Sequence, residues 1–213
     1  MGSLEDKCSI RRMQKPGNEM TNENPRLFVD MDGTIAEFQV ISQLEKLYEK
    51  GYFLKLKPIE NVLDAIKMII RENPEIEVYV ISSVLSDSKY ALEEKNKWLD
   101  KYLPEIDPAH RIFPPCGEDK KNYVIGGVRK TDFLLDDYTK NLTLWQPPAK
   151  AIKLLNGINH TIGTWKGNRV SFEKSPQRLA SDIRLIVKQN LHIYDERPNQ
   201  QKQGKRTVIN KTR

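Results

Sequence analysis

A short apolar run near the start of the chain ends at an aspartate, and this stretch constrains the fold more than any other. Leu27 to Val29 are apolar, Asp30 follows directly, and Asp32 comes two residues later. Gly33 then allows a tight turn. In open α/β sheets, functional side chains gather at the carboxyl ends of the strands. At such an end Asp30 can act as a nucleophile and Asp32 as a general acid and base.

An Asp-x-Asp-Gly pattern also occurs in calcium loops and ordinary turns, so this pattern alone does not identify a function. Polar pairs recur just after predicted strands or at a helix start: Asp30/Asp32, Ser82/Ser83, Lys120/Lys121 and Asp136/Asp137. Because parallel strands end at one edge of a sheet, we expect these groups to converge. Clustered carboxylates require a cation, and oxygen ligands favour Mg²⁺. Together with a hydroxyl and an ammonium, they suit phosphoryl transfer.

Hydrophobic periodicity predicts the secondary structure around these clusters. Strands are predicted over 26–30, 77–81, 111–113, 132–135 and 151–155, and helices over 37–52, 59–72, 87–102, 120–125 and 176–190. A turn or short helix is predicted over 138–144, and a small hairpin within 157–172. The alternation predicts an α/β fold, a Rossmann-like parallel sheet with helices on both faces. The interval after the first strand leaves room for a small helical cap at about residues 37–57.

Composition and charge predict one folded domain with polar ends. The 213 residues have a mean hydropathy of -0.63 and two cysteines, with no membrane-length apolar run, so we expect a cytoplasmic protein. Residues 1–25 are predicted to be a flexible arm, 26–192 the core, and 193–213 a basic, disordered tail. From Asp195 to Arg213 six basic residues face two acidic ones, a net charge of +4. Such a tail could attract nucleic acid.

Four short motifs, taken in order, resemble those of the haloacid dehalogenase-like phosphohydrolases. They are Asp-Met-Asp-Gly-Thr (30–34), Val-Ile-Ser (80–82), Asp-Lys (119–120) and Leu-Leu-Asp-Asp (134–137). Within that superfamily, the stretch from Phe28 to Phe38 is similar to the start of the 5′(3′)-deoxyribonucleotidases. The segment Leu-Leu-Asp-Asp-Tyr-Thr-Lys-Asn-Leu is similar to them as well.

The resemblance implies a role for each catalytic residue. Asp30 would form an aspartyl-phosphate, and Asp32 would protonate the leaving oxygen and then activate water. Ser82 would hydrogen-bond the phosphoryl group. Lys120 would neutralise the phosphate and Asp30, and the adjacent Lys121 is the alternative.

The resemblance also implies the residues that bind metal and substrate. Mg²⁺ would be held by Asp30, by the main-chain carbonyl of Asp32, and by Asp136 and Asp137. The substrate would meet Gly33, Thr34, Ser83 and Phe38. Phe38 would stack on the base, although it also lies on the apolar stripe of the predicted helix. Tyr138 stands where the vertebrate enzymes have arginine, so their contact at that point is not carried over.

The function expected from these residues is Mg²⁺-dependent hydrolysis of a phosphomonoester, with a 5′-nucleotide, preferably a deoxyribonucleotide, as substrate. Another small phosphate or a nucleic-acid end is the alternative within enzymes. A binding module without catalysis is the alternative outside them. The intact set of motif residues argues against that last reading. A homodimer that covers the site is left open.

Overall fold

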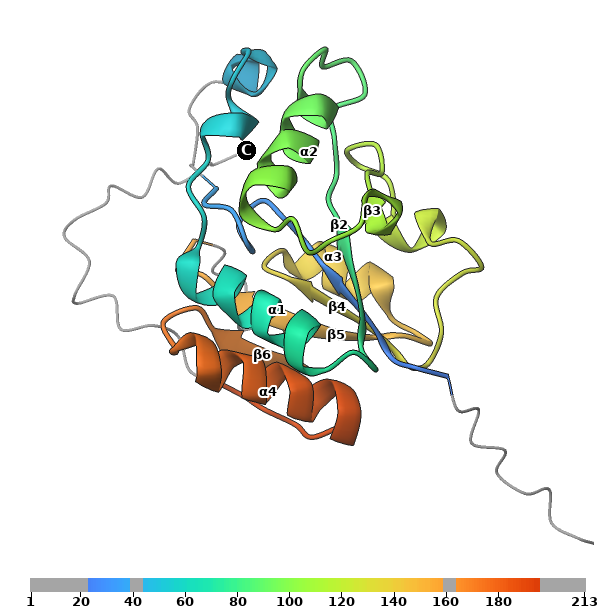
Figure 1. Ribbon diagram of the computed structural model, residues 1–213. Helices are drawn as coiled ribbons and strands as arrows, with labels where there is room; N and C mark the ends of the chain where they lie inside the picture. Colours follow the sequence, from blue (N-terminus) through green and yellow to red (C-terminus); the bar gives the residue numbers. More distant parts are fainter. Residues whose placement is uncertain (1–22, 39–43, 159–163, 196–213) are drawn as a thin grey trace, which may run out of the picture.

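A six-stranded parallel sheet forms the centre of the molecule (Figure 1). The structure is a computed structural model, and it describes residues 23–38, 44–158 and 164–195. Its order is β3-β2-β1-β4-β5-β6, and every neighbouring pair is parallel. The strands are β1 (Arg26–Val29), β2 (Glu77–Ile81), β3 (Arg111–Ile112), β4 (Asp132–Asp136), β5 (Lys150–Leu155) and β6 (Asn168–Ser171). The predicted α/β class is confirmed.

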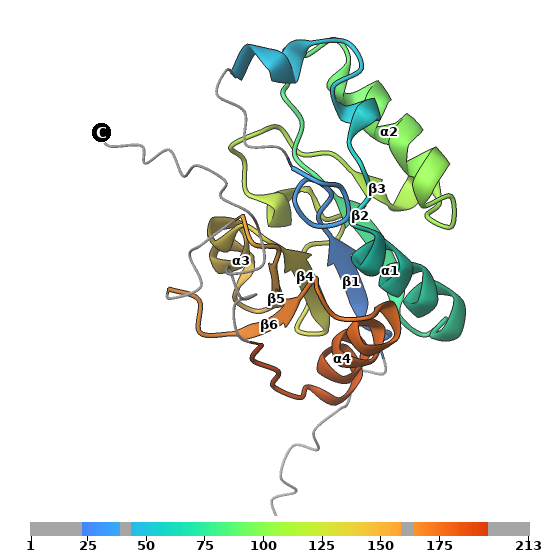
Figure 2. The same cartoon turned by 90° about the vertical axis from the view of Figure 1, so that its left-hand side faces the viewer.

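Helices cover both faces of this sheet. They are α1 (Glu60–Glu72), α2 (Ala91–Tyr102), α3 (Thr139–Trp145) and α4 (Pro176–Gln189), with 3₁₀ turns η1 (Leu44–Tyr48), η2 (Phe53–Lys55), η3 (Pro108–His110) and η4 (Lys120–Tyr123). Figure 2 shows α1 and α4 on one face and α3 on the other. Ser88, two residues before the N-cap Tyr90 of α2, accepts at Oγ a hydrogen bond from the N–H of Ala91 at 3.2 Å, while Tyr90 itself makes no capping bond through its side chain.

β1 is buried along its whole length because it lies in the middle of the sheet and is packed on both faces. Leu27 and Val29 belong to the apolar cluster under α1, α2 and α4. Phe28 belongs to the apolar cluster on the opposite face and packs with Trp145 of α3, with the ring centroids 5.0 Å apart. β1, which leads into the first motif, is therefore packed between two neighbouring strands and between the apolar clusters on the two faces of the sheet.

A buried ion pair fixes the register of β1 against β4 at their amino ends. Arg26 and Asp132 are register partners. Arg26 donates to the Asp132 carboxylate from Nε at 2.9 Å and from Nη2 at 2.6 Å, and Asp132 has no solvent exposure. A bidentate pair of this kind is directional as well as attractive. It therefore sets which residues of β1 and β4 stand side by side at the carboxyl end.

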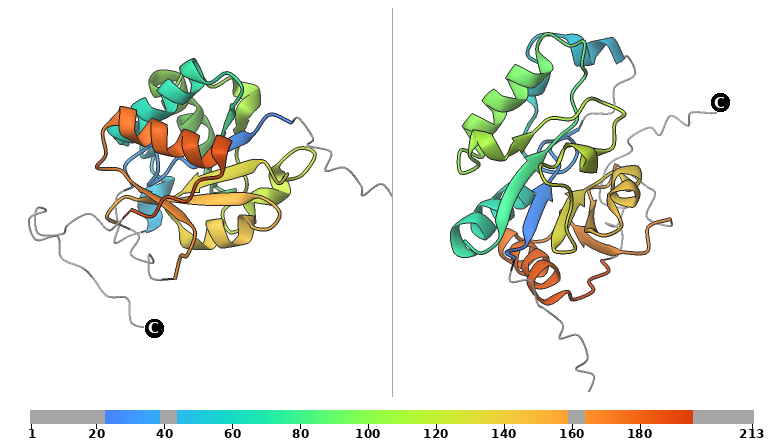
Figure 3. Two further views of the ribbon diagram at one scale, coloured as in Figure 1. Left: turned by 90° about the horizontal axis from the view of Figure 1, so that it is seen from below. Right: turned by 90° about the vertical axis from the view of Figure 1, so that its right-hand side faces the viewer.

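The segment after β1 differs from its prediction. The helix predicted over 37–52 is wrong in its described parts: Glu37 donates its N–H to Lys57 O at 2.7 Å, and the chain then forms only the short turns η1 and η2. Leu44, expected on a buried stripe, is 66% exposed. Residues 39–43, which include Ile41 of that stripe, lie outside the described residues. The cap (residues 44–56 in its described part) stands beside α2, above the carboxyl ends of the strands (Figure 3).

The end of the domain also differs from its prediction. The hairpin expected within 157–172 is contradicted by β6, which pairs in parallel with β5, while residues 159–163 are outside the described part. Two residues beyond the predicted end of the core pair with β6: Arg169 donates its N–H to Ile193 O at 2.9 Å and accepts at O from the N–H of Asp195 at 3.1 Å. Residues 1–22 of the predicted arm and 196–213 of the predicted tail are not among the described residues. No described helix has the length and apolar character needed to cross a membrane.

Candidate active site

Asp30 stands at the carboxyl end of β1, and a buried lysine lies against it. The Asp30 N–H donates to Leu135 O at 2.9 Å, which continues the pairing with β4. Lys120, from the start of η4, donates from Nζ to Asp30 Oδ1 at 2.6 Å and to Asp136 Oδ2 at 2.7 Å. The side chain of Lys120 is 3% exposed, whereas Lys121 is only half-buried. Of the two lysines, Lys120 is the one that reaches Asp30.

Three carboxylates form a compact group around this lysine. One oxygen each from Asp30, Asp136 and Asp137 lies within 4.8 Å of the others, and all three residues are buried. Asp136 is held in place by the N–H of Tyr138 at 2.7 Å and by Asn141 Nδ2 at 2.9 Å. Buried carboxylates at this spacing repel one another unless a cation joins them, and hard oxygen donors suit Mg²⁺. The donor set therefore fits the metal that the motifs imply.

A glycine and an asparagine shape the space around Asp137. Gly33 has φ +86°, and a Cβ at this position would lie 2.6 Å from Asp137 Oδ2. Asn156, directly after β5, donates from Nδ2 to Gly33 O at 2.6 Å and to Asp137 Oδ2 at 2.8 Å. Lys153 donates to the main-chain carbonyl of Asp137 at 2.7 Å. Gly33 is thus needed both for its left-handed backbone and for its missing side chain.

Gly33→Ala is expected to lower the affinity for Mg²⁺ by roughly 10- to 100-fold, the range found when partners behind metal ligands are changed. The added methyl group would displace the Asp137 carboxylate from its partners. Isothermal titration of the metal-free protein with MgCl₂ measures the effect. Gly117→Ala is the control, since Gly117 also has positive φ but nothing lies within 4 Å of a Cβ there. Equal losses in the two variants would contradict the assignment to Asp137.

The Asp32 carboxylate is not one of the three grouped carboxylates, and it binds a second lysine. Lys95 of α2 donates from Nζ to Asp32 Oδ2 at 2.5 Å, to Ser82 Oγ at 3.0 Å and to Ser83 O at 2.7 Å. The Lys95 side chain has no solvent exposure, and that of Asp32 is 21% exposed. The two aspartates of the first motif therefore face different partners, as two different roles in one reaction require. Any contact of the Asp32 main-chain carbonyl with Mg²⁺ stays a prediction.

Two polar atoms near the first turn are buried and have no hydrogen-bond partner among the described residues. They are Asp32 Oδ1 and Thr34 Oγ1. Such atoms are costly to bury unless something else binds them. Thr34 has no solvent exposure, so a substrate contact from its side chain stays a prediction, as does one from Ser83, whose carbonyl is used by Lys95. Phe38 is half-buried, and its predicted stacking on a base also stays untested.

Burial dominates the electrostatics of the nucleophile candidate. Desolvation raises the pKa of Asp30 to about 8, Lys120 opposes the rise, and the charges of Asp136, Asp32 and Asp137 add to it. Burial lowers the pKa of Lys120, but Asp136 and Asp30 outweigh this, so its pKa is raised and the ammonium persists. Without a metal, the cluster therefore retains a proton near neutral pH.

The metal-free protein is expected to lose stability as the pH rises from about 4 to about 8. In this window folded Asp30 holds a proton that an unfolded aspartate, with a pKa of about 3.9, has released. Each pH unit then costs up to about 1.4 kcal/mol of unfolding free energy. Thermal melts in EDTA should show this slope, and Asp30→Asn should flatten it. Mg²⁺ should raise Tm more at pH 8 than at pH 6. An identical slope in both proteins would contradict the raised pKa.

Lys95 and Asn156 were not identified from sequence, although each carries a signal. Lys95 lies on one helical face with Ala91, Trp98 and Leu99, all buried, so a charged residue interrupts an apolar stripe. Asn156 follows β5 in the same way that Asp30 follows β1. A role in the site becomes evident only from bonds to another element: Lys95 binds Asp32, and Asn156 binds Gly33, both in the turn after β1.

A model of the protein family described as 5′ nucleotidase, deoxy (pyrimidine), cytosolic type C matches residues 41–171, more than half of the 213 residues. The chain belongs to this family. The match confirms the resemblance to haloacid dehalogenase-like deoxyribonucleotidases. Within this cytosolic type C family member, the matched range contains Ser82, Lys95, Lys120 and the Asp136/Asp137 pair, and it begins after Asp30 and Asp32. The match therefore does not include the first motif.

Similar proteins from staphylococci carry the provisional name 5′(3′)-deoxyribonucleotidase. One from Staphylococcus epidermidis is 27% identical over 128 residues, which is 60% of this chain and 62% of the relative. One from Staphylococcus aureus is 27% identical over 126 residues, 57% of this chain and 63% of the relative. This member of the cytosolic type C family thus spans a little over three fifths of the length of the relatives it matches.

Solved structures resemble the cytosolic type C family member more loosely. A D,D-heptose 1,7-bisphosphate phosphatase from Burkholderia thailandensis has a TM-score of 0.48 and 11% identity, covering 75% of this chain and 97% of that one. A chain of a Pnkp1/Rnl/Hen1 complex has a TM-score of 0.45 and 15% identity, covering 68% and 51%. Likenesses with TM-scores below 0.5 are too loose to identify a substrate.

Proposed function

We propose that this protein is a Mg²⁺-dependent phosphomonoesterase that removes phosphate from 5′-nucleotides, with a preference for deoxyribonucleotides. The observation that carries the proposal is the separation of the two aspartates. Asp30 lies in the carboxylate group with Lys120, while Asp32 lies 2.5 Å from Lys95 on the side of Ser82. A nucleophile and a proton carrier need distinct surroundings of this kind. The family and the names of the relatives support the choice of nucleotide.

The reaction proceeds in two displacements at phosphorus. In the first, a carboxylate oxygen of Asp30 bonds to phosphorus, the ester P–O bond breaks, and the leaving oxygen takes a proton from Asp32. In the second, Asp32 takes a proton from water, the water oxygen bonds to phosphorus, and the bond to Asp30 breaks. The products are the nucleoside and inorganic phosphate, and both aspartates return to their starting states.

The remaining side chains hold charge and geometry during these steps. Lys120 keeps the Asp30 carboxylate in place and offsets the negative charge of the phosphoryl oxygens. Ser82 and Lys95 occupy the side facing Asp32, where a hydroxyl and an ammonium can bind the transferred group. Mg²⁺ held by Asp30, Asp136 and Asp137 would supply positive charge that reduces repulsion between the carboxylates and the phosphate.

A substrate panel with Mg²⁺ tests this function. The purified full chain is assayed on 5′- and 3′-deoxyribonucleotides, 5′-ribonucleotides, a sugar phosphate and a 5′-phosphorylated oligonucleotide, each with and without EDTA. We expect the highest kcat/KM on a 5′-deoxyribonucleotide and loss of turnover on chelation. A clear preference for the sugar phosphate or the oligonucleotide would overturn the substrate, and inactivity on every phosphate would overturn the reaction.

A further inference from the structure

A buried glutamate on α2 binds the main chain of the cap. Glu94 Oε1 accepts a hydrogen bond from the N–H of Gly51 at 2.5 Å, and Oε2 accepts one from the N–H of Phe53 at 3.2 Å. Glu94 is 6% exposed. A buried carboxylate destabilises a fold unless its oxygens are hydrogen-bonded, and these two amides satisfy one bond on each. The Glu94 carboxylate therefore binds the main chain of two cap residues, Gly51 and Phe53.

The next residue of the same helix turn reaches the active site. Lys95 donates to Asp32 from Nζ, and that same Nζ lies 4.7 Å from the centroid of the Phe53 ring. Phe53 is 4% exposed, so its ring covers the ammonium from solvent. Phe53 therefore makes two contacts: its amide binds Glu94, and its ring covers Lys95, the partner of Asp32.

Tyr52 lies between the two amides that Glu94 binds. Its ring meets the Phe53 ring edge-on, with centroids 5.0 Å apart. Its hydroxyl is buried and has no hydrogen-bond partner among the described residues. Burial, and then the negative charge of Asp32, raise the pKa of this phenol, so the side chain stands within the field of that carboxylate.

We propose that Glu94 is a positioning residue that holds Gly51–Phe53 as the wall of the site facing the leaving group, and so favours phosphate esters with a large leaving group such as a nucleoside. This inference rests on the proposed function. Lys120 and the carboxylates that it binds stand on η4, β1 and β4, whereas the two hydrogen bonds of the Glu94 carboxylate go to the cap. The effect of Glu94 should therefore depend on the size of the leaving group.

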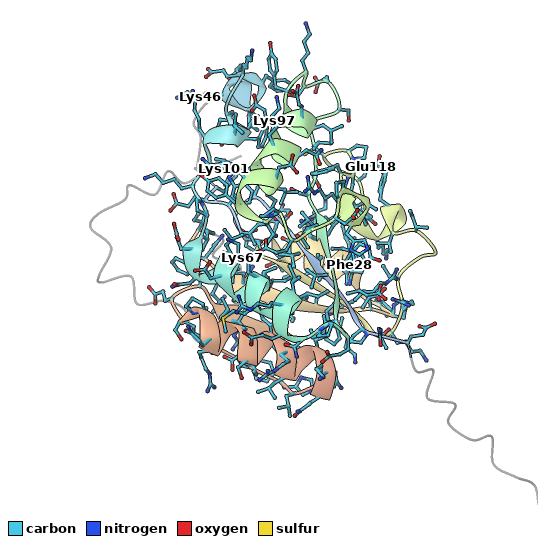
Figure 4. All side chains as sticks on the ribbon, viewed as in Figure 1. Phe28, Lys46, Lys67, Lys97, Lys101 and Glu118 are labelled. Atoms are coloured by element: carbon cyan, nitrogen blue, oxygen red, sulfur yellow. The ribbon has the colours of Figure 1, made fainter. Side chains whose placement is uncertain are left out.

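The matched control is the preceding residue. Glu93 is exposed on the same turn and pairs with Lys97, which Figure 4 places on α2. Glu94→Gln and Glu93→Gln each remove one charge from the same helix. The glutamine at 94 keeps the shape of the side chain, but its amide NH₂ would meet a backbone N–H in place of an acceptor.

Hydrogen exchange tests the contact without any enzymatic activity. We expect the amides of Gly51 and Phe53 to exchange roughly tenfold faster or more in Glu94→Gln than in the wild type, and at wild-type rates in Glu93→Gln. Unchanged exchange in Glu94→Gln would overturn the proposal. If this variant fails to fold, Glu94→Asp keeps the charge, but its side chain is one methylene too short to bind both amides, so fast exchange is expected in it as well. Slow exchange at both amides in the aspartate variant would then overturn it.

Kinetics test the consequence. With a 5′-deoxyribonucleotide, Glu94→Gln should lower kcat/KM by about tenfold, mainly through KM. With glycerol phosphate, an alkyl ester without a base, the change should stay within about twofold. Equal losses on both substrates would mean a general structural defect and would overturn the positioning role. Should the wild type hydrolyse neither ester, the proposed function fails, and the exchange data alone decide whether Glu94 holds the cap.

Discussion

Asp30→Asn is expected to abolish phosphate release, with kcat lowered by at least about 10⁴-fold, as when other enzymes lose a nucleophile. Asparagine has nearly the same shape, but its neutral carboxamide is too weak a nucleophile to form the acyl phosphate that a carboxylate forms. The fold should persist, because the change removes one charge from a cluster of buried carboxylates. Circular dichroism and a thermal melt check the fold, and a phosphate-release assay checks turnover.

Two comparisons make this result specific. Asp64→Asn changes an exposed aspartate on α1 and should keep wild-type turnover. Mass spectrometry of the wild type quenched in acid during turnover should show an added phosphoryl group on the peptide containing Asp30, and none in Asp30→Asn. Substantial turnover by the asparagine variant would exclude the covalent route, even if the protein proved to be a nucleotidase.

Lys120→Met is expected to lower kcat/KM by about 10³-fold, the upper range for loss of one preorganised donor to a reacting group. Methionine fills a similar volume but leaves Asp30 and Asp136 without their shared ammonium. Breaking a buried charge pair costs about 3–5 kcal/mol when the remaining charge stays ionised. Urea unfolding alongside the kinetics separates the loss of stability from the loss of rate per folded molecule.

Lys121→Met provides the internal comparison for that experiment. Lys121 is adjacent in sequence and half-buried, while Lys120 is buried between two carboxylates. Lys121→Met should change kcat/KM by less than about twofold. The opposite pattern, an inactive Lys121→Met beside an active Lys120→Met, would transfer the role to Lys121 and contradict the geometry of η4.

The elements that carry the first and last motifs could be predicted because their signals are local. β1 and β4 are short apolar runs that end in aspartate, and a strand buried on both faces needs only such a run. The cap was less predictable. Its apolar residues have helical spacing, yet Leu44 and Tyr48 are exposed and the chain forms short turns that Glu94 and Trp98 tether to α2. These tethers come from residues about 40 positions away.

The site was predictable where a residue type and its place at a strand end agree, as for Asp30 and Asp136. Lys95 and Glu94 show where this reasoning stops. Within a helix of mixed charges, sequence alone did not reveal that two adjacent residues are buried and point to different partners. Only the position of α2 between the cap and β2 gives Glu94 the cap amides and Lys95 the Asp32 carboxylate.

The Arg26–Asp132 pair has a consequence for assembly of the site. A slip of one residue between β1 and β4 would displace Asp30 from Asp136 by about 3.3 Å and turn the side chains of one strand to the other face. The oxygens that now lie within 4.8 Å of one another could no longer share an ion. Because Arg26 and Asp132 are partners in the observed alignment, binding of a divalent cation by the three carboxylates would report during refolding that β1 and β4 had paired correctly.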